Sequence, residues 1–515
     1  MLLIEYFDKG AQLTPDRIFL IEGGAERTYR QVQDSSHRIA NALARAGVEV
    51  DERAAVYSHN CVAAVECLLG IVRRGCVWVS ANTRNGVEET ASVLNNTAVE
   101  VFFYGAKYAA EARRIMAMCP SIRLAVCLDG EDGSHPSLEQ FTAGAAAVFE
   151  GDFRKSGDVV TLFSSGGTTG APKGVMMTNL GWSALVANIY CNYFHEAPVQ
   201  LIAAPLTHGA GAFLLTMASM GTINVVLPGF DAVAVMESIQ RHKVTHLFLP
   251  PTAIYAILAH PDVRKYDYSS LRFFTFTGAP MAPDKIKEAV SVFGPVMAAA
   301  FGQTESGLNS TFFPPGELAQ AIATGNEARL QSCGRVTPFV RVEVMDEEGR
   351  LLPAGERGEL VVRGDQIMIG YWNNPEETKR ASGFGWHRSG DIGYKDKDGW
   401  VFIVDRKRDM IISGGFNVFP AEIEKVVVSH PAVEDCIVVG VPDEKWGEVV
   451  TAVVQLKAGR VVDVDELKAF CRERLGGVKT PKQFDVWQEL PRSPVGKLLR
   501  RKVRETYWSD RDRNV

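Results

Sequence analysis

The chain has 515 residues, of which 55 are basic and 61 acidic, so that its formal charge is −6 at pH 7. Because 46% of the residues are hydrophobic and 23% charged, the composition is that of a globular protein with about two to four structural units. This charge balance offers no surface for nucleic acid, and no apolar stretch reaches the roughly 18 residues that span a bilayer. The N-terminus lacks the basic and apolar regions of a signal peptide. We therefore predict a cytoplasmic protein that neither crosses a membrane nor binds nucleic acid.

The cysteines and histidines show no metal-binding pattern. The nine cysteines are irregularly spaced without a C-x-x-C pair, which excludes a zinc ribbon and a thioredoxin-type redox motif. We expect reduced, mostly buried thiols. His242 and His246 are spaced i, i+4, but Lys243 stands where a metalloprotease helix carries glutamate. We therefore interpret this histidine pair as structural.

Up to about residue 340 the chain alternates short apolar runs with amphipathic stretches, which predicts strands connected by helices. In chain order, the clearest strands are predicted at residues 159–163, 246–249 and 273–277. Helices are predicted after the last two of these strands, at 252–260 and 283–293. Such units favour parallel sheets covered by helices, with ligands bound beyond the carboxyl ends of the strands.

From about residue 340 the pattern changes from strand–helix alternation to antiparallel hairpins. Apolar and polar residues alternate around glycine turns in three segments, 340–352, 358–364 and 399–409. We therefore predict a β-rich subdomain at about 335–405.

The residues after 410 show a separate, compact α+β pattern. Periodicity predicts four elements: a helix at 421–430, strands at 435–441 and 449–457, and a helix at 465–475. The predicted fold class is therefore α/β, with a large N-terminal domain of mixed or parallel sheets flanked by helices, a β-rich subdomain, and a small α+β C-terminal domain. No low-complexity linker separates these parts, so the boundary near 405–410 is a candidate for a tight hinge.

The segment 162–174, Leu-Phe-Ser-Ser-Gly-Gly-Thr-Thr-Gly-Ala-Pro-Lys-Gly, follows a predicted strand and has the composition of a phosphate-binding loop. Its glycines let the backbone present N–H groups, its Ser and Thr hydroxyls add donors, and Lys173 supplies positive charge. It is not a Walker A loop, because Pro172 and Gly174 flank the lysine. We predict that this loop holds a polyphosphate.

Four further motifs follow the glycine-rich loop in the chain. They are Phe301-Gly-Gln-Thr-Glu-Ser306, His387-Arg-Ser-Gly-Asp-Ile-Gly393, Asp405-Arg-Lys-Arg-Asp-Met-Ile-Ile-Ser-Gly-Gly-Phe-Asn417 and Pro491-Arg-Ser-Pro-Val-Gly-Lys497. In type and order, all five motifs resemble those of the adenylate-forming superfamily, which contains acyl-CoA synthetases, aryl-CoA ligases, peptide-synthetase adenylation domains and beetle luciferases. The chain is identified as a member of this superfamily, and the resemblance covers essentially its whole length.

The resemblance implies an enzyme that joins a carboxylic acid to a thiol in two half-reactions. The carboxylate attacks the α-phosphorus of ATP and releases pyrophosphate, and the thiol of CoA then displaces AMP from the acyl-adenylate. ATP, Mg²⁺ and CoA are therefore expected. The implied catalytic residues are His208, Thr304 and Lys497, with Glu305 as the carboxylate that holds Mg²⁺.

The nucleotide site implied by the resemblance draws on all five motifs. Phe301 is expected to stack on adenine, and Asp391 and Arg406 to bind the ribose. The implied residues of this site are Ser165, Gly166, Gly167, Thr168, Thr169, Lys173, Gly278, Ala279, Pro280, Phe301, Gly302, Gln303, Thr304, Asp391, Arg406 and Lys497.

The resemblance also implies a division of the chain around a hinge. Residues 1–405 would form an N-terminal adenylation domain that holds the ATP and acyl sites. Residues 406–410 would form the hinge, with Arg408 at the hinge position, and residues 411–515 a small mobile lid domain that carries Lys497. This lid is expected to rotate between the two half-reactions.

The acyl substrate is the part of the function on which the sequence says least. The implied acyl pocket consists of His208, Gly209, Ala210, Gly211, Phe213 and Gly278. The small residues after His208 leave unfilled volume without a charged partner, which favours a bulky hydrophobic acid, aryl or polycyclic. A medium- or long-chain fatty acid is the alternative, because small residues equally suit a tunnel.

The acceptor of the acyl group is a second open choice. By resemblance, Gly414 and Gly415 border a channel for CoA. The alternative acceptor is the phosphopantetheine arm of an acyl carrier protein. No carrier domain is attached to this chain, which favours free CoA. The sequence does not predict an oligomeric state.

Overall fold

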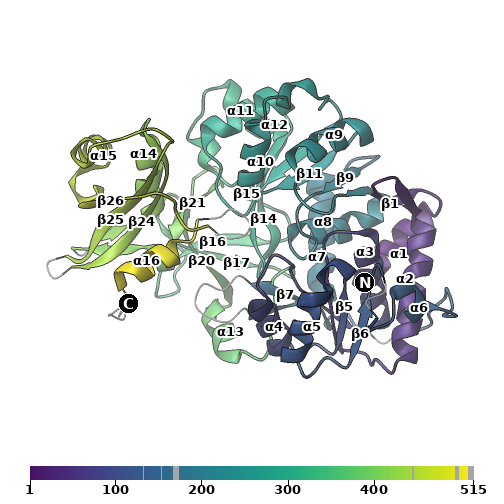
Figure 1. The fold of residues 1–515 in the computed structure, drawn as a ribbon. Helices are drawn as coiled ribbons and strands as arrows, with labels where there is room; N and C mark the ends of the chain where they lie inside the picture. Colours follow the sequence, from purple (N-terminus) through teal and green to yellow (C-terminus); the bar gives the residue numbers. More distant parts are fainter. Residues whose placement is uncertain are drawn as a thin grey trace. The chain divides into compact units, whose positions relative to one another are not determined.

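The structure is a computed structural model that describes residues 1–130, 133–151, 154–165, 173–414, 416–443, 446–492 and 498–508. The chain folds into two compact units, drawn in sequence colours in Figure 1. Unit 1 comprises Met1–Val342, Val361–Arg388 and Gly399–Val401, and unit 2 comprises Glu343–Leu360, Ser389–Asp398 and Phe402–Val515. Within the described ranges, no helix has both the length and the apolar character that crossing a bilayer requires.

One sheet of unit 1 has seven strands in the order β18-β8-β7-β4-β3-β5-β6. Strands β3 to β7 are parallel, whereas β8 and β18 run antiparallel to their neighbours. The strands are β3 (Arg53–Tyr57), β4 (Val77–Ser80), β5 (Val101–Tyr104), β6 (Leu124–Cys127), β7 (Val159–Ser165), β8 (Lys173–Thr178) and β18 (Gly370–Tyr371). Along β3, Ala54 and Val56 join one core cluster, and Ala55 and Tyr57 join another. Both faces of the sheet are therefore buried, as parallel sheets require.

The helices on the two faces of this sheet come from successive connections of the chain. Helices α2 (Tyr29–Arg45) and α3 (Val62–Arg74) pack in the first cluster, and α4 (Val87–Asn96) and α5 (Ala109–Met118) pack in the second. The connection that leaves β3 therefore covers one face, and the connection that leaves β4 covers the other.

The second sheet of unit 1 has nine strands in the order β15-β14-β13-β12-β11-β9-β10-β1-β2. From β1 to β13 in this order the strands are parallel, and β2, β14 and β15 are antiparallel to their neighbours. The strands are β1 (Ile18–Glu22), β2 (Ala25–Thr28), β9 (Val199–Ile202), β10 (Ile223–Val226), β11 (His246–Leu249), β12 (Phe273–Phe276), β13 (Met297–Gln303), β14 (Gly307–Phe313) and β15 (Arg335–Val336).

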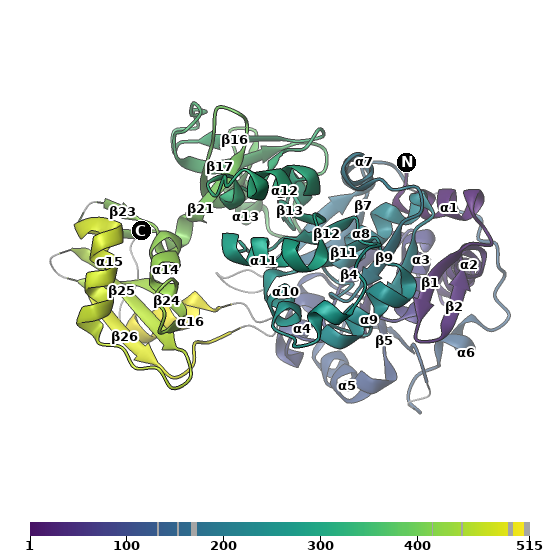
Figure 2. The same cartoon turned by 90° about the horizontal axis from the view of Figure 1, so that it is seen from above.

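One layer of helices lies between the two sheets of unit 1. Figure 1 shows α7 (Asn179–Tyr193) and α8 (Gly209–Met217) between β7 on one side and β9 and β11 on the other. A single core cluster contains buried residues of these helices and of both sheets. The far face of the nine-stranded sheet is covered by α9, α10 and α11, seen from above in Figure 2. The remaining helices of unit 1 and those on the far face are α1 (Leu3–Leu13), α6 (Leu138–Thr142), α9 (Ala232–His242), α10 (Pro251–Leu258), α11 (Pro283–Phe293), α12 (Pro315–Ala323) and α13 (Pro375–Ala381).

The strands and helices predicted in this part of the chain are confirmed. The strands at 246–249 and 273–277 are β11 and β12, and the helices at 252–260 and 283–293 are α10 and α11, with ends that differ by at most two residues. Proline at the first turn of both helices sets their starts, because its fixed φ suits the first helical position.

The hairpin pattern predicted after residue 340 is also confirmed. A third sheet has the strand order β16-β17-β20-β19, and β21 pairs with β20. Its strands are β16 (Arg341–Met345), β17 (Gly358–Arg363), β19 (Ser382–Gly383), β20 (Trp386–Lys395) and β21 (Val401–Arg406).

Unit 2 ends in a small α+β sandwich. Its sheet has the order β23-β22-β25-β24, and β26 pairs with β25. Helices α14 and α15 pack on one face in one cluster, and α16 packs on the other (Figure 1). The helices and strands predicted after residue 410 are confirmed. The elements are β22 (Ile411–Ser413), β23 (Phe416–Val418), α14 (Pro420–Val428), β24 (Val433–Asp443), β25 (Gly447–Leu456), α15 (Val464–Lys479), β26 (Gln483–Trp487) and α16 (Arg500–Trp508).

The prediction of mostly buried thiols and that of a structural role for His246 are confirmed. None of the nine cysteines, all of which lie in the described ranges, forms a disulfide, and most are buried. His246 is 4% exposed, and both ring nitrogens are used inside the protein: Nε2 lies 2.8 Å from the Tyr193 carbonyl and Nδ1 2.7 Å from the Thr245 hydroxyl. Burial lowers its pKa to about 4, so His246 is a neutral structural residue at pH 7.

Candidate active site

The glycine-rich segment connects two paired antiparallel strands. Ser165 at the end of β7 pairs in register with Lys173 at the start of β8. Gly166, Gly167, Thr168 and Thr169 lie outside the described residues. Lys173 forms an ion pair with Glu377, and its Nζ lies 5.1 Å from the centre of the Tyr371 ring. The hydrogen bond from Lys173 is the main reason that the pKa of Glu377 is lowered.

Tyr371 connects this lysine to the carboxylate expected to hold the metal ion. Its hydroxyl donates to Glu305 Oε1 at 2.9 Å, and the carbonyl of Glu305 accepts from the Met368 N–H. Burial and the nearby Glu305 carboxylate raise the pKa of Tyr371, so its hydroxyl stays a donor. Lys173 and Glu305 therefore face one aromatic ring from two different sheets. Sequence reasoning missed Tyr371, which stands in none of the five motifs.

The residues at this place fit Mg²⁺ held mainly by a nucleotide. Glu305 keeps Oε2 without a recorded partner in the described chain, and Thr304 beside it is exposed. Both groups are oxygen ligands, which a hard cation prefers. No set of three or more His, Cys, Asp or Glu side chains able to hold a metal ion occurs among the described residues. A site with one carboxylate suits Mg²⁺, which usually shares its ligands between a carboxylate, water and substrate phosphates.

Several expected nucleotide contacts stand at one edge of the nine-stranded sheet. Gly278, Ala279 and Pro280 follow the carboxyl end of β12 and are exposed. A side chain on Gly278 would meet nothing within 4 Å, although its φ of +85° favours glycine. Strand β13 pairs with β12 up to Ala299 and then continues to Gln303, so that Phe301-Gly-Gln projects beyond β12. Because parallel strands present their carboxyl ends at one edge, this edge is a natural place for a ligand.

The residues within Phe301-Gly-Gln-Thr differ in their exposure to solvent. Phe301 is 7% exposed, whereas Thr304 is exposed in the turn between β13 and β14. A side chain on Gly302 would bring its Cβ within 2.1 Å of the Gly307 carbonyl oxygen. The close approach of β13 and β14 therefore requires this glycine. Gln303 lies 3.4 Å from Nε2 of His387, which brings two of the motifs together within unit 1.

Asp391 and Arg406, both expected on the ribose, form an ion pair with each other in unit 2. Arg406 Nε lies 2.8 Å from Asp391 Oδ1, and the Asp391 side chain is 3% exposed. The backbone N–H of Asp391 is held by the Ser389 hydroxyl at 3.0 Å. The two groups are thus placed together, as contacts to one sugar would need.

His208 stands at the start of α8, at the same edge of the nine-stranded sheet. It is the N-cap residue of the helix, and Nδ1 lies 3.0 Å from the Thr207 hydroxyl. Desolvation by the surrounding protein is the main cause that lowers the pKa of His208, and the positive charge of Arg84 lowers it further, although part of the residue is exposed. Its imidazole is therefore neutral at pH 7, which makes it a proton acceptor.

The small residues after His208 have a packing reason that the sequence did not reveal. A side chain on Gly211 would bring its Cβ within 1.9 Å of the Leu206 carbonyl oxygen, and one on Gly209 within 2.9 Å of the Phe248 ring. Ala210 and Phe213 belong to the hydrophobic core and are 2% and 5% exposed. The expectation of unfilled volume is therefore wrong at Gly211, because a backbone carbonyl already occupies that space.

A cavity of about 180 Å³ lies next to Thr207. Its walls come from the loops that follow β3, β4, β9 and β10, including His59, Arg84, Thr207 and Gly229. In each sheet these are neighbouring parallel strands: β3 and β4 in one, β9 and β10 in the other. Open α/β sheets bind ligands beyond the carboxyl ends of their strands. The cavity therefore stands beyond the carboxyl ends of strands from both sheets.

Some polar atoms of this cavity have no hydrogen-bond partner among the described residues. Trp78 Nε1 and His59 Nδ1 are buried and have no hydrogen-bond partner in the described chain. Arg84 is exposed at the cavity and forms no recorded ion pair with any described residue. An N–H donor and a guanidinium without partners favour a ligand that carries acceptor atoms. Sequence reasoning missed these residues, which stand in none of the five motifs.

The hinge motif and its glycine pair lie in unit 2. Gly414 has a φ of +57° in the turn between β22 and β23, and a side chain there would approach the Trp446 ring to 2.7 Å. Arg408 stands in the 3-10 turn Lys407–Asp409, where burial lowers its pKa. Gly415 and Lys497 lie outside the described residues.

Comparison with known proteins decides the family. Residues 7–372 match the model of the AMP-binding enzyme family, and residues 422–497 match that of the AMP-binding enzyme C-terminal domain. The chain belongs to the AMP-binding enzyme family. This confirms the adenylate-forming superfamily identified from the motifs.

Similar members of the AMP-binding enzyme family act on different acids. The chain is 35% identical over 503 residues to feruloyl-CoA synthase of Amycolatopsis sp, covering 96% of this chain and 97% of that protein. It is 39% identical over 365 residues to the medium/long-chain-fatty-acid–CoA ligase FadD8 of Mycobacterium tuberculosis, covering 69% of this chain and 63% of that protein. The structure of the amide bond synthetase McbA from Marinactinospora thermotolerans matches with a TM-score of 0.88 at 28% identity, covering 98% of this chain and 100% of that one.

These findings establish the reaction class. The protein is an AMP-forming acyl-CoA synthetase that uses ATP, Mg²⁺ and CoA. Its fold is the α/β fold predicted from the sequence, with a large N-terminal part, a β-rich part and a small C-terminal domain.

Proposed function

We propose that this synthetase activates a bulky hydrophobic carboxylate of the aryl or polycyclic class and transfers it to CoA. The proposal rests on how much of the chain each relative matches: the match to feruloyl-CoA synthase extends over 96% of the chain, whereas the match to FadD8 covers 69%. The segment 205–213 around His208 contains no charged side chain, which suits an apolar acid. A medium- or long-chain fatty acid is the second candidate, favoured by the higher identity to FadD8 in the part that matches.

In the first half-reaction, a carboxylate oxygen of the acid bonds to the α-phosphorus of ATP and the bond to pyrophosphate breaks. Negative charge on the phosphate oxygens is greatest in the transition state, so fixed cations and donors stabilise it most. We assign this role to Lys173 and Thr304 in unit 1 and to Lys497. Bound Mg²⁺ would supply further neutralisation of the phosphates, with Glu305 as its protein ligand.

In the second half-reaction, the thiol sulfur attacks the acyl carbon and AMP leaves. The thiol proton needs an acceptor, and the neutral imidazole of His208 at the start of α8 would provide one. The cavity beside Thr207 supports an approach for CoA at this place. Arg84 suits a phosphate group, and the unpartnered N–H of Trp78 suits an amide carbonyl of the pantetheine arm. From the family resemblance, Gly414 and Gly415 of unit 2 are proposed to border the channel for the pantetheine arm.

The family resemblance also suggests a role for each part of the chain. We propose that residues 1–405 hold ATP and the acid, that residues 406–410 around Arg408 act as the hinge, and that residues 411–515 form the lid. Asp391 and Arg406 are the proposed ribose ligands, and their mutual ion pair supports a common target. Loops that carry function on a rigid scaffold are the common arrangement in enzymes.

The test is a pyrophosphate-release screen with the full chain, ATP, Mg²⁺ and CoA. The acids are ferulate, cinnamate, benzoate, a polycyclic carboxylate, and fatty acids of medium and long chain. Highest kcat/KM with an aryl or polycyclic acid supports the proposal, and highest kcat/KM with a fatty acid replaces it with the second candidate. Thioester must appear with free CoA; product only in the presence of a phosphopantetheinylated carrier protein would reject CoA as the acceptor.

A further inference from the structure

The turn between β13 and β14, which carries the carboxylate expected to hold Mg²⁺, is held by a second segment of unit 1 that ends in β18. Gln366 Nε2 donates to the Ser306 carbonyl at 2.8 Å. The Met368 N–H donates to the Glu305 carbonyl, and the Tyr371 hydroxyl donates to Glu305 Oε1, both at 2.9 Å. The first two bonds fix the main chain of the turn. Only the bond from Tyr371 reaches the carboxylate itself.

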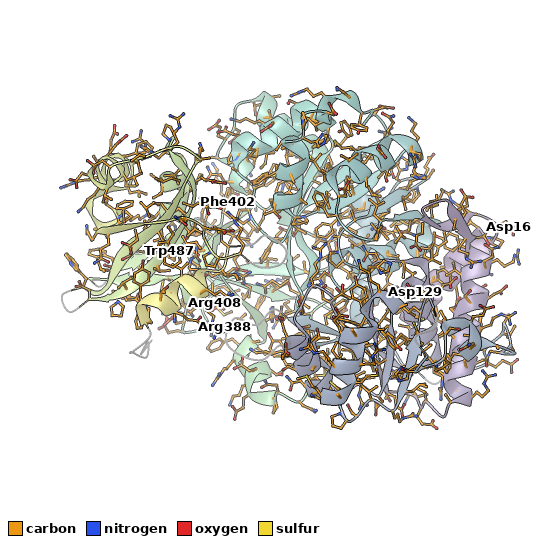
Figure 3. All side chains as sticks on the ribbon, viewed as in Figure 1. Asp16, Asp129, Arg388, Phe402, Arg408 and Trp487 are labelled. Carbon is orange, nitrogen blue, oxygen red and sulfur yellow. The ribbon has the colours of Figure 1, made fainter. Side chains whose placement is uncertain are left out.

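Tyr371 is held independently of the carboxylate that it contacts. In β18 it pairs in register with Val175 of β8, and its N–H donates to the Thr378 hydroxyl at 2.9 Å. It is 9% exposed and belongs to the same core cluster as Val175, among the side chains that Figure 3 shows as sticks. The place of its hydroxyl therefore follows from the sheet and the core. Tyr371 can thus determine where the carboxylate of Glu305 lies.

The carboxylate of Glu305 needs such a contact to keep one orientation. The last torsion of a glutamate side chain has no sharp preference, so a carboxylate without a partner turns easily. Glu305 is half-buried, and its Oε2 has no recorded partner among the described residues. The Tyr371 hydroxyl on Oε1 therefore sets the plane of the carboxylate and leaves Oε2 as an acceptor for a cation. Groups that hydrogen-bond to metal ligands orient them in this way, and their loss typically weakens metal binding about 10–100-fold.

The ring of Tyr371 makes a separate contact. Lys173 Nζ lies 5.1 Å from the centre of this ring, and Lys173 also forms an ion pair with Glu377. An ammonium group is attracted by the face of an aromatic ring and does not need the hydroxyl for this. The substitution Tyr371→Phe therefore removes the contact with Glu305 and keeps the contact with Lys173.

We propose that Tyr371 is a positioning residue for Mg²⁺, whose hydroxyl holds Glu305 in the orientation in which Oε2 stays available to the metal ion of bound ATP. The inference rests on the proposed function, in which Glu305 is the protein ligand of Mg²⁺. Tyr371 acts through Glu305 in this role and touches neither ATP nor the metal ion. Its effect should therefore appear only when the metal ion is bound.

The experiment measures the affinity of the full-length Tyr371→Phe enzyme for α,β-methylene-ATP, once with Mg²⁺ and once with EDTA. We expect Kd with Mg²⁺ to rise about tenfold, the lower end of the usual range, because phosphates and water supply the other ligands. The Kd in EDTA should stay close to wild type. In adenylation, followed by acid-dependent exchange of pyrophosphate into ATP, KM for Mg²⁺ should rise by a similar factor, and kcat at saturating Mg²⁺ should change much less.

The matched control is Tyr268→Phe. Tyr268 is 7% exposed, and its hydroxyl donates to the Val263 carbonyl at 2.7 Å, so this variant also removes one bonded hydroxyl from the core of unit 1. Tyr268 precedes β12, whereas Gly278 of the candidate site follows this strand. We expect Tyr268→Phe to lower Tm as Tyr371→Phe does, and to leave Kd with Mg²⁺ and Kd in EDTA unchanged.

A double variant tests whether the hydroxyl acts through Glu305. Glu305→Ala should weaken binding with Mg²⁺ and not in EDTA, and the addition of Tyr371→Phe should weaken it no further. Additive losses, an equal loss with Mg²⁺ and in EDTA, or an unchanged Kd for Tyr371→Phe would overturn the inference. If Glu305→Ala binds the analogue with Mg²⁺ as wild type does, the assignment of Glu305 in the proposed function fails, and the inference fails with it. A loss in Glu305→Ala without a loss in Tyr371→Phe would refute the inference alone.

Discussion

The two units position their candidate site residues by different means. In unit 1 these residues follow the carboxyl ends of parallel strands: His208 after β9, Gly278 after β12 and Thr304 after β13. In unit 2 the two candidate ribose ligands, Asp391 on β20 and Arg406 at the end of β21, are held by an ion pair with each other. Backbone topology and a shared core fix the first set, whereas single side chains fix the second. Substitutions in unit 2 should therefore change one step sharply, and substitutions in unit 1 should change binding or stability more broadly.

The largest expected effect is that of Lys497→Ala. Loss of one preorganised charged donor typically costs about 10²–10³ in rate, or about 3–4 kcal/mol. We expect adenylation to fall by this factor, and thioester formation from supplied acyl-adenylate to stay near normal. Lys502→Ala, which removes an exposed lysine of α16, is the matched control. If both half-reactions fall together, or neither does, the one-step role expected of unit 2 is wrong.

The folding stability of the two units should also depend on pH in opposite directions. In unit 1, burial lowers the pKa of His246 to about 4 from an ordinary value near 6.5. The unfolded chain therefore binds more protons between these values, so stability is full above about pH 6.5 and is lost as the pH falls towards 4. The difference corresponds to about 3 kcal/mol. Hydrogen-exchange protection factors of β11, measured from pH 7 to 4, should fall in the wild type and stay flatter in His246→Gln.

In unit 2 the buried carboxyl of Asp405 gives stability the opposite dependence on pH. Burial raises the pKa of Asp405 to about 6, and the charge of Glu424 adds a small further rise. The charge of Arg500 and the N–H groups of Ala421 and Arg406 act in the opposite direction but do not outweigh burial. The folded chain binds more protons between about pH 4 and 6, so the contribution of this group is present below about pH 4 and is lost as the pH rises through 6. It too amounts to about 3 kcal/mol. Protection of α14 in the wild type should therefore decline over this range relative to Asp405→Asn. A constant difference between the two proteins would contradict the raised pKa.

The contrast between the units also explains what the sequence predicted and what it did not. Strand β11 and helix α10 were predictable because a short apolar run, a proline pair and helical spacing all act locally. The contact of Tyr371 with Glu305 was not, because it joins residues 66 positions apart and depends on how β18 pairs with β8. The space near Gly211 was misjudged for a similar reason: residue size does not reveal that the Leu206 carbonyl fills the neighbouring volume. Motifs thus identify reacting groups, and tertiary packing decides the shape around them.

A smaller effect, on both stability and selectivity, is expected for Ala210→Trp in unit 1. Ala210 is 2% exposed within the core, and overpacking such a position costs about 1–3 kcal/mol. We expect a lower Tm, and a larger fall in kcat/KM for bulky acids than for acetate-sized ones, since α8 begins beside His208. Thermal unfolding and kcat/KM for a large and a small acid check the two parts separately. Equal loss for both acids would show that Ala210 acts only as a core residue.

The smallest expected effect concerns the acceptor, and it tests whether unit 1 contributes to the second half-reaction as well as the first. Arg84 borders the cavity beside Thr207 without a recorded ion pair in the described chain. If its guanidinium binds a phosphate of CoA, Arg84→Met should raise KM for CoA about tenfold, equivalent to about 1.4 kcal/mol, and leave adenylation unchanged. Pantetheine, which has no phosphate, should show no difference between wild type and variant. Arg114→Met, which removes an exposed arginine paired with Glu88, is the control for lost surface charge. An equal rise of KM for CoA and pantetheine would place Arg84 near the arm instead of a phosphate, and no rise at all would exclude this cavity as the route of CoA.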